Sequence, residues 1–111
     1  MVNVMTLYPK SEGCTFDFNY YLNSHMVKSV GILSKAKGYL GVSVEKGTDS
    51  PDGHVKADFV AICSYYFEST EDFLAAFLPH AEFLQGDIVN YTNILPKNQI
   101  SSVEIWSRSE N

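Results

Sequence analysis

The residues with the clearest chemical potential are two tyrosines and a histidine, spaced as Tyr20-Tyr21-x-x-x-His25. Residues four apart share one face of a helix, so His25 lies one turn after Tyr21 on the apolar stripe of a predicted helix. A histidine titrates near neutrality, which suits His25 to acid or base catalysis, with Tyr21 orienting it or a ligand. The alternative is a core histidine that hydrogen-bonds an ordinary neighbour.

Polar residues in the second half of the chain supply further candidates. The segment 86–93 is rich in Asp and Asn, and Asn90 or Thr92 could donate to a ligand while Tyr91 forms a pocket wall. Such residues also bond their own backbone in tight turns, which is the alternative. His80 follows a proline, and a kink there could aim its ring into a pocket, although an exposed position is the other interpretation.

Metal and cofactor sites are not predicted. His25, His54 and His80 are far apart and have no spaced set of Cys, Asp or Glu around them, and His54 lies in a polar loop. The chain lacks a glycine-rich phosphate loop, a G-x-S-x-G motif and a Cys-x-x-Cys motif, so no nucleotide cofactor and no covalent serine or cysteine mechanism is expected. Cys14 and Cys63 are predicted to be free thiols.

The helix that carries His25 is predicted to begin near Asp17, a good N-cap residue, and to end before Gly38. Tyr20 lies about 100 degrees around an α-helix from Tyr21, so it is expected to pack with its hydroxyl in water. The predicted apolar stripe consists of Phe18, Tyr21, Leu22, His25, Met26, Val30 and Leu33.

The rest of the chain alternates between strands and one further helix. Strands are predicted at residues 2–8, 39–46, 57–67 and 100–107. The third is apolar on both faces, which indicates a central strand or one that is covered on both sides. The second helix has Ser69 as its cap, a break at Pro79 and an end at Gly86. Leu40, Val42 and Val44 are expected to share one face of their strand, and Val103 and Ile105 are expected to face inward.

This order predicts an α+β fold of the ferredoxin-like βαββαβ type, a four-stranded antiparallel sheet with two helices on one face. Residues 1–111 are expected to form a single domain. The other face of the sheet would expose a large apolar patch, so a second copy is expected to cover it and to give a homodimer.

Composition excludes several partners. The net charge of -5 and the pI near 5.0 argue against a nucleic-acid partner. The N-terminus does not have the pattern of a signal peptide, and no apolar run approaches the ~20 residues of a membrane helix. We therefore expect a cytoplasmic protein that has no membrane partner.

Two motifs resemble the signatures of EthD-like proteins. The first motif is Leu7-Tyr8-Pro9, then Gly13, then Phe16-Asp17-x-x-Tyr20-Tyr21-x-x-x-His25-Met26. The second motif is Gly86-Asp87-Ile88-x-Asn90-Tyr91-Thr92-Asn93. At the position of Tyr91 the family more often has Phe. Together they span nearly the whole chain. The chain departs from the family at Val27. Members of the family often have a proline at this position, in a His-Met-Pro string, whereas Val27 allows the helix to continue without a kink.

The resemblance implies a dimeric α+β barrel with a pocket between sheet and helices. It implies that His25 is the functional histidine and that Tyr21, Asp87, Asn90 and Tyr91 shape the pocket. The family is named for a protein needed in the breakdown of a branched ether beside a haem monooxygenase system. Relatives in the wider superfamily include cofactor-free monooxygenases, lactone isomerases and polyketide cyclases.

Three functional hypotheses follow. The first is a cofactor-free catabolic enzyme (an oxidoreductase or monooxygenase, an isomerase or a lyase) in which His25 acts as acid or base on a small apolar oxygenated compound. The second is a non-catalytic protein that binds an apolar ligand or assists an oxygenase system. The third, a haem-handling protein, is disfavoured because the motif does not match that of haem-binding barrels.

Overall fold

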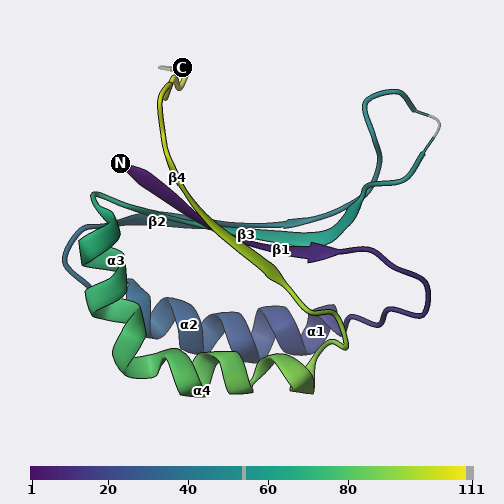
Figure 1. Cartoon of the computed structure of the whole chain (residues 1–111), viewed down its shortest axis with the longest axis horizontal. Helices are drawn as coiled ribbons and strands as arrows, with labels where there is room; N and C mark the ends of the chain where they lie inside the picture. Colours follow the sequence, from purple (N-terminus) through teal and green to yellow (C-terminus); the bar gives the residue numbers. More distant parts are fainter. Residues whose placement is uncertain (54, 110–111) are drawn as a thin grey trace.

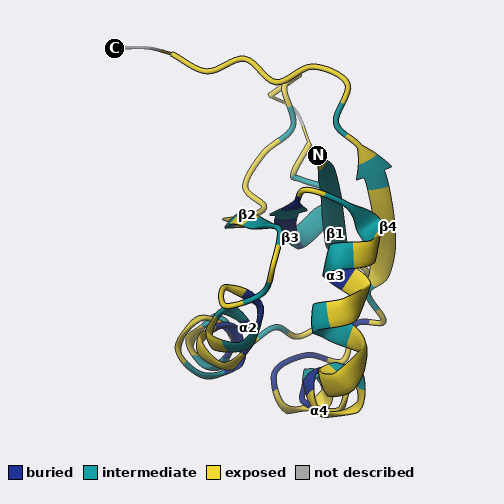
Figure 2. Ribbon diagram, turned by 90° about the vertical axis from the view of Figure 1, so that its left-hand side faces the viewer, coloured by how far each residue is buried: buried dark blue, intermediate teal, exposed yellow. Residues whose placement is uncertain are grey.

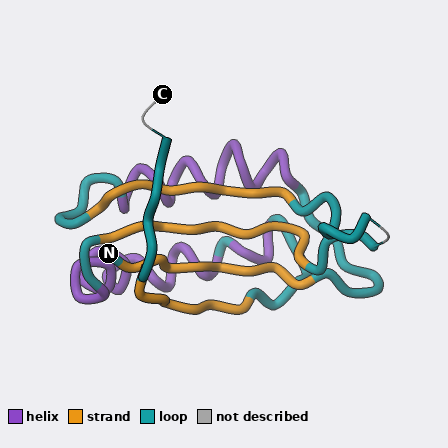
Figure 3. Tube along the Cα trace, turned by 90° about the horizontal axis from the view of Figure 1, so that it is seen from above, coloured by secondary structure: helices purple, strands orange, loops and turns teal. Residues whose placement is uncertain are grey.

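A computed structural model describes residues 1–53 and 55–109 and places them in a four-stranded sheet with all helices on one face (Figure 1). The strands are β1 (Val2–Pro9), β2 (Tyr39–Lys46), β3 (Phe59–Phe67) and β4 (Lys97–Ser102). They lie in the order β2-β3-β1-β4, and every neighbouring pair is antiparallel (Figure 3). The predicted ferredoxin-like βαββαβ arrangement and the central position of β3 are confirmed.

The first helical rod consists of α1 (Phe18–Tyr20), the π-helical turn η1 (Tyr21–His25) and α2 (Met26–Leu33). Asp17 caps it as expected, since its Oδ1 accepts from the backbone N–H of Tyr20 at 3.0 Å. The chain then turns at Gly38, which has a positive φ of 83°. A side chain at Gly38 would also collide with Asp72, so this position requires glycine twice over.

The second rod consists of α3 (Thr70–Phe77), the 3₁₀ turn η2 (Leu78–His80), α4 (Ala81–Gly86) and the 3₁₀ turn η3 (Ile88–Asn90). Ser69 is the N-cap, and its Oγ accepts from the N–H of Asp72 at 3.1 Å. The tight turn η2 contains Pro79, which confirms the predicted break. Seen end-on, α2 and α4 lie side by side beneath the sheet (Figure 2).

The core lies between the sheet and the two rods. Antiparallel register places Tyr8 opposite Ala61 and Val2 opposite Phe67, so these side chains share the face that the helices cover. The neighbouring residues on the strands point to the other face, where Met5, Leu7, Ile62 and Tyr66 lie. The buried apolar residues are Tyr8, Tyr21, Met26, Leu33, Ala61, Cys63, Tyr65, Phe67, Phe73, Leu84, Tyr91 and Ile94.

The chain beyond β4 crosses the outer face of the sheet (Figure 3). The ring of Trp106 lies 5.5 Å from that of Tyr66, centroid to centroid. Trp106 and Ile105 remain 60% and 87% exposed. The segment therefore touches the outer face without burying itself in it.

The predicted last strand was wrong in its bounds. It was expected at residues 100–107 with Val103 and Ile105 inward, but β4 ends at Ser102. The reason is that β4 pairs with β1, and β1 begins at Val2. Beyond Ser102 one more backbone hydrogen bond forms, from Val103 N–H to Met1 O at 3.0 Å, and then β4 has no partner left among the described residues. Leu40 was also misplaced: it is 50% exposed at the register shift between β2 and β3, whereas Val42 and Val44 pack on the core.

No helix in the described part of the chain is long and apolar enough to cross a membrane. His54, which was expected in a polar loop, lies outside the described residues.

The burial pattern predicts a large contrast between two phenylalanines. Phe67 is 0% exposed at the centre of the core and Phe83 is 53% exposed on α4. We expect Phe67→Ala to lower the free energy of unfolding by about 3 to 5 kcal/mol, because it removes buried contacts and leaves a cavity. Phe83→Ala should change it by less than about 1 kcal/mol. Urea unfolding measures both, and similar losses would contradict the packing described above.

Candidate active site

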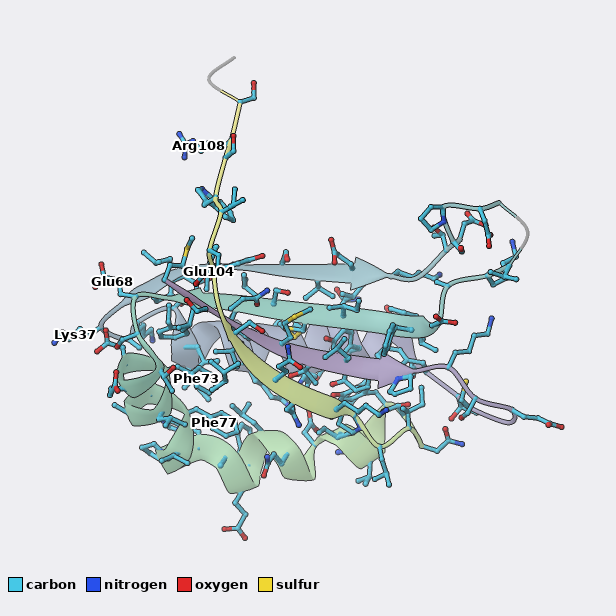
Figure 4. The ribbon with its side chains drawn as sticks, turned by 45° about the horizontal axis from the view of Figure 1, so that its top comes forward. Lys37, Glu68, Phe73, Phe77, Glu104 and Arg108 are labelled. Atoms are coloured by element: carbon cyan, nitrogen blue, oxygen red, sulfur yellow. The ribbon has the colours of Figure 1, made fainter. Side chains whose placement is uncertain are left out.

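A cavity of about 200 Å³ lies between the sheet and both helical rods. Figure 4 shows Phe73 and Phe77 projecting from α3 into the space beneath the sheet, where they line it. An apolar cavity of about 150 Å³ is known to hold benzene, so this volume suits a ligand of about one ring. The other apolar lining residues are Val4, Met26, Leu33, Leu84, Ile88 and Pro96.

The cavity continues towards the edge strand β4. Thr6, Gln85 and Asn98 line both the cavity and an adjoining hollow that reaches Gln99 and Ile100. Thr6 Oγ1 donates to Asn98 Oδ1 at 3.1 Å across the β1–β4 pair. These polar residues form the side of the cavity that faces the edge strand β4.

His25 lines the cavity and is 8% exposed. Its Nδ1 lies 2.9 Å from Oδ2 of Asp87. Because a carboxylate only accepts hydrogen bonds, Nδ1 carries a hydrogen, and in the neutral imidazole Nε2 then keeps its lone pair. Nε2 has no hydrogen bond to any described residue. A carboxylate that orients a histidine in this way leaves the second nitrogen ready to accept a proton.

Asp87 is held by more than the histidine. Its Oδ1 accepts from the Tyr20 hydroxyl at 2.7 Å and from Asn90 Nδ2 at 2.9 Å, and Lys28 Nζ lies 3.9 Å away. Burial by itself would raise the pKa of this carboxyl. The hydrogen bonds from Tyr20, Asn90 and His25, together with the charge of Lys28, outweigh burial and lower the pKa of Asp87 to about 2. Asp87 is therefore ionised at neutral pH.

The π-helical turn η1 brings these side chains together. The N–H of Met26 donates to the carbonyl of Tyr21, five residues earlier, where an α-helix would use four. This spacing allows Tyr20 and His25, also five apart, to reach the same carboxylate. The rings of Tyr21 and His25 still stack, with centroids 5.8 Å apart and planes 15° apart. Leu22, expected on the apolar stripe, is 46% exposed.

Tyr91 supports the histidine ring from the other side. Its ring centroid lies 4.8 Å from that of His25 and 4.9 Å from that of Tyr21. Its hydroxyl is 2.6 Å from the Tyr8 hydroxyl. Burial raises the pKa of Tyr8 to about 12 and also raises the pKa of Tyr91, so both hydroxyls are neutral.

The Tyr21 hydroxyl is buried without a hydrogen-bond partner among the described residues. The side chain is 1% exposed and lines the cavity, with Cys63 and Tyr8 as its polar neighbours. Burial first, and then the neighbouring Cys63, raises the pKa of this hydroxyl, so it keeps its proton. An unpaired buried hydroxyl destabilises a fold by about 1 to 3 kcal/mol, and one that lines a cavity is available to a ligand.

The segment that contains Asp87 is fixed to the loop before the first helix. Asp17 N–H donates to Tyr91 O at 2.8 Å, and Thr92 Oγ1 donates to Thr15 O at 2.6 Å. Asn93 accepts from Thr15 N–H at 2.9 Å. The side chains of Thr92 and Asn93 thus form hydrogen bonds with the backbone, as the alternative interpretation of this segment expected. These bonds hold the two motif segments together.

Five of the six predicted site residues meet in one cluster: Tyr21, His25, Asp87, Asn90 and Tyr91. Only Tyr21 and His25 line the cavity, and the other three lie behind the His25 ring. His80 does not join them, because it is exposed at the end of η2 and does not line the cavity.

Sequence reasoning missed two residues of the cluster and the cavity wall, Tyr20 and Ser29. Tyr20 was expected only to pack, since nothing in the sequence indicated a π turn. Ser29 is buried in the cavity wall, with its Oγ 2.7 Å from the Tyr65 hydroxyl. The signal for Ser29 was present, because it lies one turn after His25 on the same helical face.

In residues 1–53 and 55–109, no group of three or more His, Cys, Asp or Glu side chains could hold a metal ion.

These features define a ferredoxin-like α+β protein with a ring-sized cavity beside an oriented histidine. A crystal structure of an EthD-like protein from Ralstonia eutropha is 37% identical and superposes with a TM-score of 0.86, covering 99% of this chain and 96% of that chain. The chain therefore belongs to the EthD-like family, which confirms the resemblance of its two motifs.

More distant solved structures share the fold. An ethyl tert-butyl ether D (EthD) family protein from Bacillus halodurans is 21% identical with a TM-score of 0.67, covering 93% of this chain and 98% of that one. A cofactor-independent oxygenase from Streptomyces nogalater is 12% identical with a TM-score of 0.56, covering 95% and 93%. No protein-family model and no curated protein sequence matches the chain.

The low pKa of Asp87 has a consequence for stability. Its pKa is lowered from an ordinary value of 3.8 to about 2, so folding favours the ionised form. The resulting stability is present above about pH 4 and is lost as the pH falls towards 2. We expect Asp87→Asn to lower the free energy of unfolding by about 1 to 3 kcal/mol at neutral pH, and the deficit to shrink between about pH 4 and pH 2.

Urea unfolding across this pH range measures the deficit. Asp49→Asn is the control, because Asp49 forms an exposed ion pair with Lys56 at 3.3 Å that is worth at most about 1 kcal/mol. A deficit for Asp87→Asn that does not change with pH would contradict the ionised network.

Proposed function

We propose that this EthD-like protein is a cofactor-free enzyme of small-molecule metabolism, in which His25 transfers a proton to or from a small, largely apolar, oxygenated compound. One observation carries the proposal. His25, oriented by the buried Asp87, lines the same ring-sized cavity as Tyr21, whose hydroxyl has no hydrogen-bond partner among the described residues. An oriented base and a free donor are the two groups that proton abstraction beside a carbonyl requires.

In the proposed mechanism, Nε2 of His25 removes a proton from the carbon next to a carbonyl, or from a hydroxyl. The imidazolium that forms is stabilised by the ionised carboxylate of Asp87 at 2.9 Å. Negative charge develops on the ligand oxygen, and the Tyr21 hydroxyl donates to it. A hydrogen bond to a charged oxygen is stronger than one to a neutral carbonyl, so Tyr21 would act mainly in the transition state.

Tyr20, Asn90 and Tyr91 are positioning residues in this proposal. Tyr20 and Asn90 hold the carboxylate of Asp87, and the Tyr91 ring lies against His25. They would fix the tautomer and the angle of the imidazole without touching the ligand. Removal of a proton is a first step shared by isomerases, lyases and cofactor-free oxygenases, so the site is compatible with all three classes.

The alternative is a binding or accessory protein for an oxygenase system. The apolar cavity supports it as well, because the same lining would hold a metabolite without changing it. The relative from Bacillus halodurans is described as an ethyl tert-butyl ether D (EthD) family protein, and the structural neighbour from Streptomyces nogalater is a cofactor-independent oxygenase. Hydrogen exchange of a bound ketone distinguishes the two functions, because only the enzyme would catalyse it.

We expect the protein to catalyse exchange of the ring hydrogens beside the carbonyl of cyclohexanone in D2O, followed by NMR. His25→Ala should slow exchange by about a hundredfold to ten-thousandfold, because it removes the proton acceptor. The matched control is His80→Ala, which removes an exposed histidine that does not line the cavity. Saturable binding of cyclohexanone with no exchange above buffer would instead support the accessory function.

We also propose that the protein is a homodimer that pairs the outer faces of two sheets. Met5, Leu7 and Ile62 lie on this face and are only half-buried. Closed twofold dimers are the commonest oligomers, and the face would otherwise leave apolar side chains in water. We also propose that the protein is cytoplasmic, as its sequence led us to expect.

The dimer predicts that a charge on the outer face produces monomers. Leu7→Asp should halve the mass found by analytical ultracentrifugation, since an unpaired carboxylate would be buried between the sheets. Leu22→Asp is the control, because Leu22 is 46% exposed on the helical side. A wild-type protein that sediments as a monomer at micromolar concentration would contradict the proposal.

A further inference from the structure

A second polar pair lies in the cavity wall, one helical turn beyond His25. Ser29 Oγ and the Tyr65 hydroxyl are 2.7 Å apart, and both residues line the cavity. They are 5% and 6% exposed. Neither residue has a role in the proton transfer proposed for His25, so the pair needs a separate explanation.

Counting hydrogens shows what this pair can offer. Each hydroxyl carries one hydrogen and two lone pairs, and their mutual bond uses only one of the two hydrogens. Burial raises the pKa of Tyr65, so its proton is retained at neutral pH. The second hydrogen has no acceptor among the described residues. The pair is therefore a neutral donor in an otherwise apolar part of the cavity.

The distance between this pair and the His25 end is set by two independent elements. His25 and Ser29 are four residues apart on the helical rod, which places their Cβ atoms about 5 to 6 Å apart. Cys63, beside the Tyr21 hydroxyl, and Tyr65 are two residues apart on one face of β3, which gives about 7 Å. Helix and strand thus both place the residues that carry the two polar ends about 5 to 7 Å apart along their own element, which is on the scale of one six-membered ring.

We propose that the Ser29–Tyr65 pair is a second oxygen-binding subsite, and that the ligand is a single-ring compound with one oxygen at each end. One oxygen meets Tyr21 and His25, and the other accepts the free hydrogen of the Ser29–Tyr65 pair. Met26, Leu33, Phe73 and Phe77 supply apolar contacts for the ring between them. This inference rests on the proposed function, because it extends the same cavity.

The test uses two ligands of nearly equal shape, 4-hydroxycyclohexanone and 4-methylcyclohexanone. Both carry the carbonyl for the His25 end, and only the first carries a second oxygen. We expect the wild type to bind the hydroxy compound about fivefold to tenfold more tightly, which is the net effect of about one hydrogen bond. Titration calorimetry measures the dissociation constants, and hydrogen exchange in D2O gives a second readout.

The variant Ser29→Ala/Tyr65→Phe removes both hydroxyls and keeps the wall of the cavity. It should abolish the preference while leaving the affinity for 4-methylcyclohexanone within about twofold of wild type. Tyr66→Phe is the matched control, since Tyr66 is the next residue of β3 and points to the outer face. It should keep the preference. If the double variant fails to fold, Tyr65→Phe alone should reduce the preference.

The outcomes separate this inference from the proposed function. Equal affinity of the wild type for the two ligands, or a preference that survives in the double variant, would overturn the second subsite. Exchange of 4-methylcyclohexanone that depends on His25 would still support the proposed function in that case. Failure of both ligands to bind would overturn both proposals.

Discussion

One carboxylate connects the parts of the site that the sequence keeps far apart. Asp87 follows the second helical rod, yet it accepts hydrogen bonds from Tyr20 and His25 on the first. A buried carboxylate without these donors would be neutral or would destabilise the fold. Because the donors are present, the charge is retained, and it fixes the angle and the tautomer of His25. The π turn and the docking of residues 88–93 on the loop before the first helix both bring groups to this carboxylate.

The cavity combines an apolar wall with hydroxyls that stay neutral. Tyr8, Tyr21 and Tyr65 all have pKa values raised by burial, so they can donate hydrogen bonds but do not act as bases at neutral pH. His25 is the one cavity-lining side chain among the described residues whose type suits base catalysis near neutrality. This division between one base and several neutral donors favours chemistry in which negative charge develops on a ligand oxygen.

Much of the fold could be predicted from patterning. Strand β2 was predicted with its observed bounds, and Asp17 and Ser69 cap their helices because their side chains accept backbone hydrogen bonds that no other group would take. The end of β4 could not be read from its own residues, since it depends on where its partner β1 begins.

The site was predictable only in part. His25 and Tyr21 stood out through helical spacing, and the second motif supplied Asp87 and Asn90 through family resemblance. Tyr20 was missed because an α-helical wheel turns it away, and a π turn has no clear sequence signal. Ser29 was missed for a different reason: as a polar residue it was not assigned to the apolar stripe, and its partner Tyr65 comes from a distant strand.

The tail beyond β4 gives the molecule an optical asymmetry. Trp106 is the single tryptophan of the chain, and its ring contacts Tyr66 on the outer face of the sheet. The cavity on the opposite face is lined by tyrosines. Intrinsic tryptophan emission therefore reports the environment of the outer face, so a change in assembly would alter it directly. A ligand in the cavity would be separated from the indole by the full thickness of the sheet and would perturb tyrosine absorption first.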